Sequence, residues 1–350
     1  MKCPQCKGDQ KYKEGMVCGS CGWEFTLDPK VKPYMSDMAF HMAQERLSGP
    51  AGNWFTYNQL YAGVHRMLEK KKQWGMGSVV LITGVVFFIS LIPADILGIG
   101  LWLPILCAAL TTAACIFYSK RPLKIRRSTI SRIIGSYHAK HPPDRMADGK
   151  QFETAEPNGF DEKFLDFAPE RILIVERNTL ADMLLLNRFH FENKTLVLSA
   201  QKYPSAAFSA CQNTLSQFPN TPVCLIHDAS KKGIGLKEKL LADPTWHLGE
   251  KQIQDLGLFP EDVARLKRPV WMPPAEKTDG PHDSPSVHKT AAEKIGRGWV
   301  MPVDVAPPKA MMSSAALAMT AGLVLLSEEL LAEQARQAHA GTATFGGGFG

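Results

Sequence analysis

Apolar and polar residues are distributed unevenly along the chain, and the most pronounced feature is the apolar stretch 75–119, whose only charged residue is Asp95. A helix that crosses about 30 Å of hydrocarbon needs about 20 apolar residues. The stretch contains two such runs, Gly75–Ile92 and Ile96–Tyr118, which are interrupted at Pro93. Proline breaks helical hydrogen bonding and a carboxylate is costly inside a bilayer, so the interruption belongs at the membrane surface. The pattern predicts a transmembrane hairpin of two helices. The alternative is a buried apolar hairpin in a globular core, which is seldom apolar on every helix face.

Basic residues flank both ends of this stretch. Lys70–Lys72 precede the first run, five Lys and Arg residues within Lys120–Arg127 follow the second, and the connector has none. Lys and Arg are enriched in the cytoplasmic flanks of membrane helices. The pattern therefore predicts a multi-pass protein of the cell inner membrane, with the membrane as a partner and with both terminal domains in the cytoplasm.

A different pattern occupies residues 1–27, where two Cys-x-x-Cys pairs are separated by eleven residues. Four thiolates complete the tetrahedral coordination of zinc and leave no open position, which indicates a structural zinc and not a catalytic one. A unit this small needs the metal in order to fold. The segment resembles the zinc-ribbon superfamily, which includes many nucleic-acid binders. The predicted zinc ligands are Cys3, Cys6, Cys18 and Cys21.

Residues 28–74 contain two predicted helices, Ser36–Leu47 and Thr56–Lys72. Ser36 and Thr56 are suitable N-cap residues. The segment 49–52, which contains Gly and Pro, separates the helices. We interpret the segment as a helical pair that packs on the ribbon, with a helix-turn-helix as the alternative.

After a basic juxtamembrane segment and linker, 120–168, short apolar runs alternate with helical patterns through residues 169–270. The predicted strands are 171–175, 195–199 and 222–227, and the helices include Ser205–Phe218 and one that begins at Leu236. This alternation is typical of a parallel sheet that is covered by helices on both faces. The expected fold class is therefore a multi-domain membrane protein with a zinc ribbon, a two-helix transmembrane hairpin and a cytosolic α/β domain.

Polar residues follow the predicted strands, at the sheet edge where ligand sites of such folds form. Glu176 follows the first strand, Lys202-Tyr203-Pro204 the second, and Asp228 the third. These segments resemble the Toprim domain of the type VI topoisomerase A subunit and of the meiotic double-strand-break proteins. The resemblance covers under a third of the chain. It implies a magnesium site in which Glu176 acts as an acid or base and Asp228 binds the cation.

The sequence departs from the Toprim pattern at two positions. Ser230 stands where a second aspartate is expected, and Lys202 stands where a glycine is expected. A hydroxyl is a poor substitute for a carboxylate on magnesium. The neighbouring Lys231 and Lys232 disfavour a cation further, although they suit a phosphate. We therefore expect a degenerate domain that does not cleave, in which magnesium is doubtful.

Other reactive side chains in this domain have simpler structural interpretations. By strand alternation His227 points away from the face of Asp228, which favours a packed core histidine. Cys211 and Cys224 are expected to be buried apolar residues. The Gly233-Ile234-Gly235 segment is too short a signal to establish a phosphate site.

The last third of the chain changes character again. Residues 271–308 are rich in Pro, Lys, Asp and Ser and are predicted to be a linker, and 341–350 is a Gly-rich tail. Residues 309–340 have apolar positions spaced three and four apart, which predicts an amphipathic helix that docks on the chain itself, on a second copy or on a partner. A third membrane span over 310–326 is the alternative.

The overall charge adds little to this picture. The 40 Lys and Arg residues against 34 Asp and Glu make the chain only mildly basic, and the eight cysteines are not arranged as an extracellular disulfide framework. The preferred function is a membrane-anchored binding or scaffold protein that contacts nucleic acid or a cytosolic protein. The alternative is a metal-dependent nuclease or nucleotidyl-transfer enzyme that uses Glu176 and Asp228.

Overall fold

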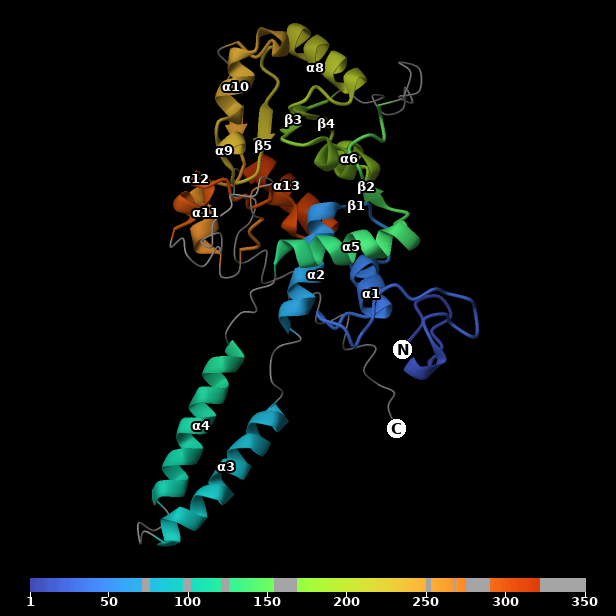
Figure 1. Ribbon diagram of the computed structural model, residues 1–350. Helices are drawn as coiled ribbons and strands as arrows, with labels where there is room; N and C mark the ends of the chain where they lie inside the picture. Colours follow the sequence, from blue (N-terminus) through green and yellow to red (C-terminus); the bar gives the residue numbers. More distant parts are fainter. Residues whose placement is uncertain are drawn as a thin grey trace.

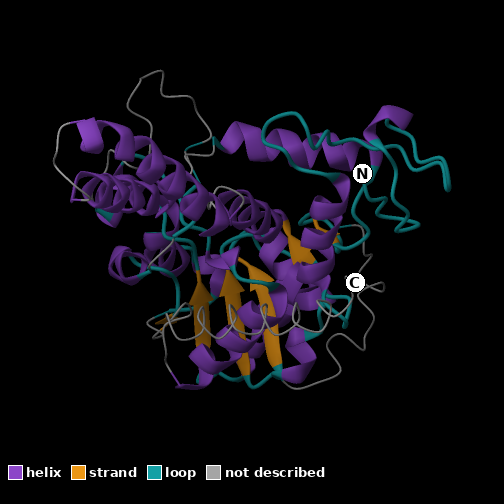
Figure 2. Cartoon of the chain, turned by 90° about the horizontal axis from the view of Figure 1, so that it is seen from below, coloured by secondary structure: helices purple, strands orange, loops and turns teal. Residues whose placement is uncertain are grey.

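The computed structural model describes residues 1–70, 76–96, 102–120, 126–153, 169–249, 253–266, 269–272, 274 and 290–321. Over these residues the chain is an α/β protein with two parallel sheets (Figure 1). The larger sheet has the strand order β4-β3-β5-β6, and every neighbouring pair is parallel (Figure 2). Its strands are β3 (Arg171–Val175), β4 (Thr195–Ser199), β5 (Val223–Ile226) and β6 (Ile253–Asp255). The first three agree with the predicted strands to within one residue, whereas β6 was not predicted.

Both faces of this sheet are buried, as the apolar runs of its strands require. Ile172 and Ile174 of β3 point into one core, which α8 (Ser205–Gln217) and α10 (Leu236–Ala242) cover. Leu173 and Val175 point into the other core, which α6 (Asn178–Leu186) covers. The carboxyl ends of β3 and β5 therefore meet at one edge, between the two helical layers.

The second core continues into the N-terminal part of the chain. Phe40, Leu60 and Ile134 belong to the same buried cluster as Leu173 and Met311. They come from α1 (Asp37–Ser48), α2 (Tyr57–Lys70) and α5 (Arg127–Lys140), and Met311 comes from α13 (Pro308–Ala321). The described N-terminal helices and the α/β unit thus share one core.

The expected N-caps of the first two helices are in place. Ser36 Oγ accepts a hydrogen bond from Ala39 N, and Thr56 Oγ1 accepts one from Gln59 N. Thr56 also ends β1 (Phe55–Thr56), which pairs in parallel with β2 (Met146–Ala147). The remaining short elements are η1 (Tyr12–Glu14), α7 (Phe189–Glu192), α9 (Lys231–Ile234), η3 (Pro244–Trp246), α11 (Pro260–Arg265), α12 (Ala291–Gly296) and η4 (Val303–Val305).

The apolar stretch forms α3 (Met76–Ile96) and α4 (Trp102–Lys120), a pair of helices that projects from the rest of the chain (Figure 1). Within the described residues no helix is both long enough and apolar enough to cross a membrane. This finding contradicts the predicted two-pass transmembrane hairpin, and with it the membrane fold class, the membrane partner and the inner-membrane localisation. It gives no support to the third span either, and only 310–321 of that segment is described.

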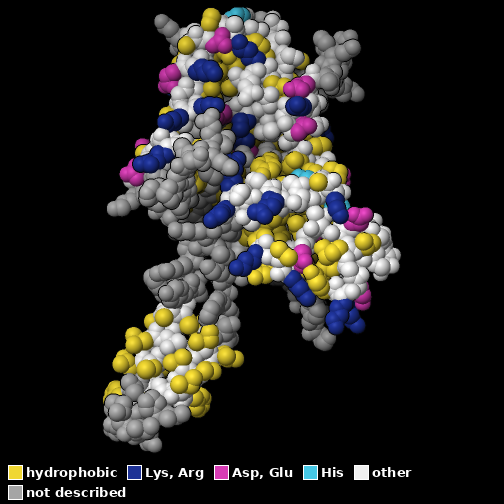
Figure 3. All heavy atoms as spheres, in the orientation of Figure 1, with side chains coloured by type: hydrophobic (Ala, Val, Ile, Leu, Met, Phe, Trp, Pro, Cys, Tyr) yellow, Lys and Arg dark blue, Asp and Glu magenta, His cyan; other side chains and the backbone are white. Residues whose placement is uncertain are grey.

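The helix pair also differs from the prediction in its internal arrangement. The helical backbone of α3 continues through Pro93 to Ile96, so the expected break lies inside a helix and not in a turn. Thr83 and Thr112 join the two helices through a hydroxyl hydrogen bond of 3.1 Å. Hydrophobic side chains cover much of the surface of the pair (Figure 3), and Leu81 and Phe88 are among the exposed ones.

The C-terminal part contains more structure than the predicted linker. Residues 290–308 include α12 and η4, and Met301 pairs with Ala229 in an isolated antiparallel bridge. Val303, Asp304 and Val305 are buried. In α13, Met311, Ala315 and Ala318 pack into the shared core, so the described part of the predicted amphipathic helix docks on the chain itself. Residues 154–168 of the predicted juxtamembrane segment and linker, 275–289 of the predicted Pro-rich linker, 322–340 of the predicted helix and the whole predicted Gly-rich tail 341–350 lie outside the described residues.

Candidate metal centre and strand-edge site

The four cysteines of the N-terminal segment lie together. Their sulfur atoms are all within 4.8 Å of one another, and the Sγ–Sγ distances are 3.5 Å for Cys3 and Cys21 and 3.7 Å for Cys6 and Cys18. Zinc bound tetrahedrally at Zn–S distances of about 2.3 Å places its sulfurs about 3.8 Å apart. The cluster can therefore hold a metal ion, and its spacing is consistent with zinc.

Backbone turns hold each Cys-x-x-Cys pair in shape. Lys7 N donates to Cys3 O, and Gly22 N donates to Cys18 O at 2.9 Å. Gly22 has a φ of 76°, which glycine adopts without the strain of a side chain. The backbone N–H groups of Ser20 and Cys21 lower the pKa of Cys18 to about 6, which favours the thiolate that binds metals.

The ribbon is anchored to the helical body through a buried carboxylate. Asp37 accepts hydrogen bonds from Trp23 Nε1, from Thr26 N and, at 2.7 Å, from Leu27 N. The Trp23 indole also stacks on the His141 ring, with 3.8 Å between centroids. The metal centre is thus connected to α1 and to the end of α5 within two residues of Cys21.

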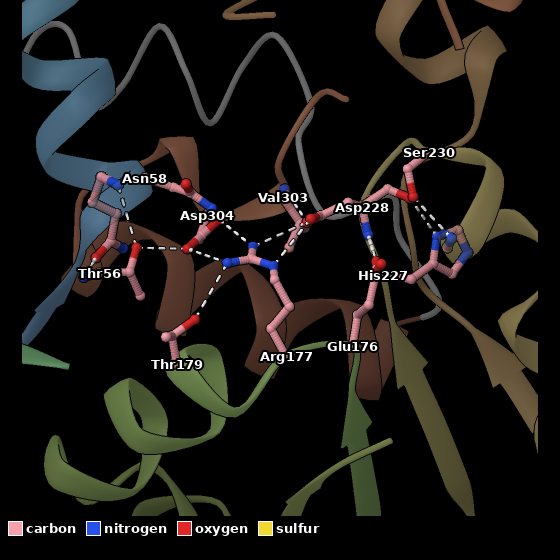
Figure 4. Close-up of polar contacts among 12 residues, drawn as sticks. Thr56, Asn58, Glu176, Arg177, Thr179, His227, Asp228, Ser230, Val303 and Asp304 are labelled. Atoms are coloured by element: carbon pink, nitrogen blue, oxygen red, sulfur yellow. Dashed lines mark hydrogen bonds and ion pairs between the residues drawn. The ribbon is translucent and has the colours of Figure 1, made fainter. Parts of the chain in front are cut away.

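The strand-edge site is built where β3 and β5 end. Glu176 follows β3, and its Oε2 accepts a hydrogen bond of 2.7 Å from Asp228 N (Figure 4). Burial, and then the charge of Asp228, raise the pKa of Glu176. Gly233 of α9 lies against both groups, because a Cβ there would be 2.2 Å from Asp228 O and 3.0 Å from Glu176 Oε2. The structure therefore brings together Glu176 and Asp228, the two residues that the sequence singled out, through a bond between the Glu176 carboxylate and the Asp228 backbone.

Arg177 occupies the centre of this site, and the sequence analysis did not identify it. Its Nε and Nη2 bind Asp228 as a fork, with both distances at 3.1 Å. Its Nη2 also lies 2.6 Å from Asp304 Oδ1, and its Nη1 lies 3.4 Å from Asp304 Oδ2. Burial alone would lower the pKa of Arg177, but the charges of the two aspartates outweigh it and raise that pKa. One guanidinium therefore joins two carboxylates from distant parts of the chain.

Asp304 is the second residue that the sequence analysis missed. Its side chain is fully buried, and besides Arg177 it accepts hydrogen bonds from Thr56 Oγ1 (2.5 Å) and Asn58 Nδ2 (3.1 Å). Burial by itself would raise the pKa of Asp304, but the guanidinium holds that pKa below its usual value. The only signal in the sequence is an isolated aspartate in the otherwise uncharged run 299–308.

These contacts leave little room for a cation on Asp228. Its Oδ1 accepts from Arg177 and, at 2.9 Å, from Val303 N, while its Oδ2 accepts from Arg177. Ser230, at the expected position of a second aspartate, uses its Oγ to cap α9 by accepting from Gly233 N. Among the described residues, the cysteine cluster is the only group of three or more His, Cys, Asp or Glu side chains close enough to share a metal ion.

The remaining predicted residues lie around this edge or in the cores. His227 is fully buried, its Nε2 is 3.1 Å from Asp255 Oδ1, and its ring packs edge-on against Phe259. Lys202 has a φ of 63° and pairs with Asp243. Lys231 and Lys232 are exposed. Cys211 and Cys224 are buried in the cores on opposite faces of the sheet.

No protein-family model, curated protein or solved structure matches this chain. The site is therefore interpreted from its own geometry.

Proposed function

We propose that this chain is a binding or scaffold protein with a structural zinc ribbon and a degenerate, non-cleaving Toprim-like unit. The main support for this proposal is that both carboxylate oxygens of Asp228 already have hydrogen-bond partners within the chain. Both of its carboxylate oxygens are engaged by Arg177, and one is engaged also by Val303 N. A phosphodiester-cleaving site of this kind needs carboxylates that are free to bind magnesium together with the phosphate.

The cysteine cluster supports zinc as the metal of the ribbon. Cys3, Cys6, Cys18 and Cys21 would hold it, and four thiolates would leave no position for a water or a substrate. Zinc there would supply folding energy, because only a small apolar cluster around Cys3, Cys18 and Phe25 stabilises this segment internally.

Three features support the Toprim likeness of the sheet. Glu176 and Asp228 lie side by side at the ends of neighbouring parallel strands. The chain after β4 adopts a left-handed φ of 63° at Lys202, the position at which the Toprim pattern has glycine. Tyr203, which stands at the tyrosine position of the same pattern, is held in place because its hydroxyl donates a hydrogen bond of 2.6 Å to the buried Asp182.

Nucleic acid is the partner that we favour over a protein. Lys231 and Lys232 are exposed directly beside the strand edge, where no carboxylate at position 230 offsets their charge. Lysines that neutralise phosphates give an affinity that falls steeply with salt. A protein partner would not require that dependence.

Incubation of the full chain with supercoiled plasmid and Mg²⁺ or Mn²⁺ tests the non-cleaving assignment. We expect neither nicking nor relaxation. Cleavage that disappears in Glu176→Gln and in Asp228→Asn would overturn the proposal in favour of the nuclease.

The nucleic-acid assignment is tested separately by binding of labelled single- and double-stranded DNA over a salt series. We expect binding that weakens steeply with salt and weakens further in Lys231→Glu/Lys232→Glu. The matched control is Lys194→Glu, because Lys194 is exposed at the amino end of β4, opposite to the strand-edge site, and pairs with Glu170. Absence of binding at low salt would contradict the nucleic-acid partner.

A further inference from the structure

The position of Arg177 between two buried aspartates supports an inference that goes beyond the proposed function. Asp228 and Asp304 are 76 residues apart in the sequence, yet both are nearly or fully buried, with side-chain exposures of 5% and 0%. Two buried carboxylates that share a site repel each other and lose their hydration, so such a pair normally requires a cation between them. The guanidinium of Arg177 supplies that cation.

Among the described residues, no other positively charged side chain contacts the carboxylates of the two aspartates. Asp304 is otherwise bound by the neutral side chains of Thr56 and Asn58, and Asp228 by the backbone of Val303. Thr179 contacts only the guanidinium, at 3.4 Å. Figure 4 shows the guanidinium lying between the two carboxylates, with Glu176 beside it. Arg177 is therefore the cation that these contacts place between Asp228 and Asp304.

We propose that Arg177 is the residue that excludes divalent cations from the strand edge, by occupying with its own charge the position between Asp228 and Asp304. This proposal rests on the proposed function, because it explains why the edge does not bind magnesium. Mg²⁺, Mn²⁺ and Ca²⁺ prefer oxygen ligands, and the carboxylate oxygens that bind Arg177 are ligands of this kind. Removal of the guanidinium leaves those oxygens without a counter-charge.

The direct test is titration of the full chain with Mn²⁺ alone, followed by electron paramagnetic resonance of the free ion. We expect no saturable site in the wild-type chain at roughly millimolar Mn²⁺, and one additional site per chain in Arg177→Ala. Arg177→Lys is the matched control, since it keeps the positive charge and should stay without the site. In the double variant Arg177→Ala/Asp304→Asn the affinity for Mn²⁺ should be lower than in Arg177→Ala by roughly tenfold or more, because one ligand is lost.

A folded Arg177→Ala variant with no additional Mn²⁺ site overturns the proposal. If the variant, kept with its zinc, does not fold in the absence of Mn²⁺, the proposal requires that Mn²⁺ restore its circular-dichroism spectrum. The double variant Arg177→Ala/Asp228→Asn should then stay unfolded when Mn²⁺ is added. Failure of Mn²⁺ to restore the spectrum of Arg177→Ala also overturns the proposal. These outcomes are independent of the proposed function, which fails instead if the wild-type chain itself binds Mn²⁺ at this edge or cleaves DNA.

Discussion

The cysteine cluster and the strand edge both gather ligand atoms at one point, but they differ in what lies between those atoms. The cluster brings together four cysteine sulfurs and could hold a metal ion, with a spacing consistent with zinc. The strand edge brings together the carboxylates of Asp228 and Asp304, and the guanidinium of Arg177 lies between them. The comparison shows that neighbouring carboxylates do not by themselves indicate a metal site, because a side-chain cation can occupy the same position.

The largest effect is expected from loss of the metal. Cys18→Ser, or treatment with a strong chelator, should unfold the ribbon, because metal binding contributes on the order of 10 kcal/mol to folding of such units. Elemental analysis should give one zinc per wild-type chain and none in Cys18→Ser. Cys107→Ser, a cysteine of α4 outside the cluster, is the control and should retain the zinc. A ribbon that stays folded and metal-free would remove the contrast between the two regions.

Loss of one acid at the strand edge should be the next largest effect. Asp304→Ala leaves Arg177 without half of its ion-pair partners and leaves Thr56 and Asn58 without an acceptor. Removal of one partner from a buried ion pair costs about 3–5 kcal/mol, which urea unfolding would measure. Glu170→Ala, which breaks the exposed pair with Lys194, should show no measurable loss. Equal behaviour of the two variants would contradict the structural role of Asp304.

A smaller change in stability is expected from substitution of a glycine that packs closely against His227. Gly257→Ala would place a Cβ 2.2 Å from Cδ2 of the buried His227, and overpacking of this kind costs about 1–3 kcal/mol. Gly135 lies on the exposed side of α5 with nothing within 4 Å of a Cβ, so Gly135→Ala should stabilise the chain by about 0.5–1 kcal/mol. Thermal unfolding of the two variants should therefore shift in opposite directions.

The smallest predicted effect is a pH dependence from His227. Burial alone would lower its pKa, but the Asp255 carboxylate, the backbone carbonyl of Asp228 and, to a smaller extent, the charge of Glu176 raise it above the usual 6.5. Protonation of His227 therefore contributes stability that is fully present below pH 6.5 and is lost as the pH rises through the raised pKa. We expect His227→Asn to reduce this dependence, measured as the difference in unfolding free energy between pH 5.5 and pH 8.5. An unchanged pH profile in the variant would show that the ring stays neutral.

Local patterns predicted the parts of this molecule that depend on local physics. The cysteine spacing identified the cluster, the N-caps Ser36 and Thr56 marked the starts of two helices, and three apolar runs marked β3, β4 and β5. Glu176 and Asp228 were expected to meet, because carboxyl ends of neighbouring parallel strands lie at one edge.

The features that were missed depend on contacts between distant residues. Asp304 contacts Arg177, which is 127 residues away in the sequence, and Thr56, which is 248 residues away. Local periodicity in the sequence does not predict contacts between residues so far apart. The segment 290–308 has a linker-like composition, yet its Val303 and Val305 are buried against elements that the sequence alone does not place beside it. The membrane prediction rested only on the run of apolar residues and on its basic flanks, and the described helices contradict it.

The contrast between a cysteine cluster that we expect to hold zinc and a strand edge held by Arg177 is tested most directly by a crystal structure of the full chain grown with millimolar Mn²⁺, with anomalous scattering recorded at the zinc and manganese edges. We predict one zinc among Cys3, Cys6, Cys18 and Cys21, and an intact Arg177 fork on Asp228 with no manganese beside it. A manganese ion bound to Asp228 and Glu176, with Arg177 displaced, would contradict this prediction.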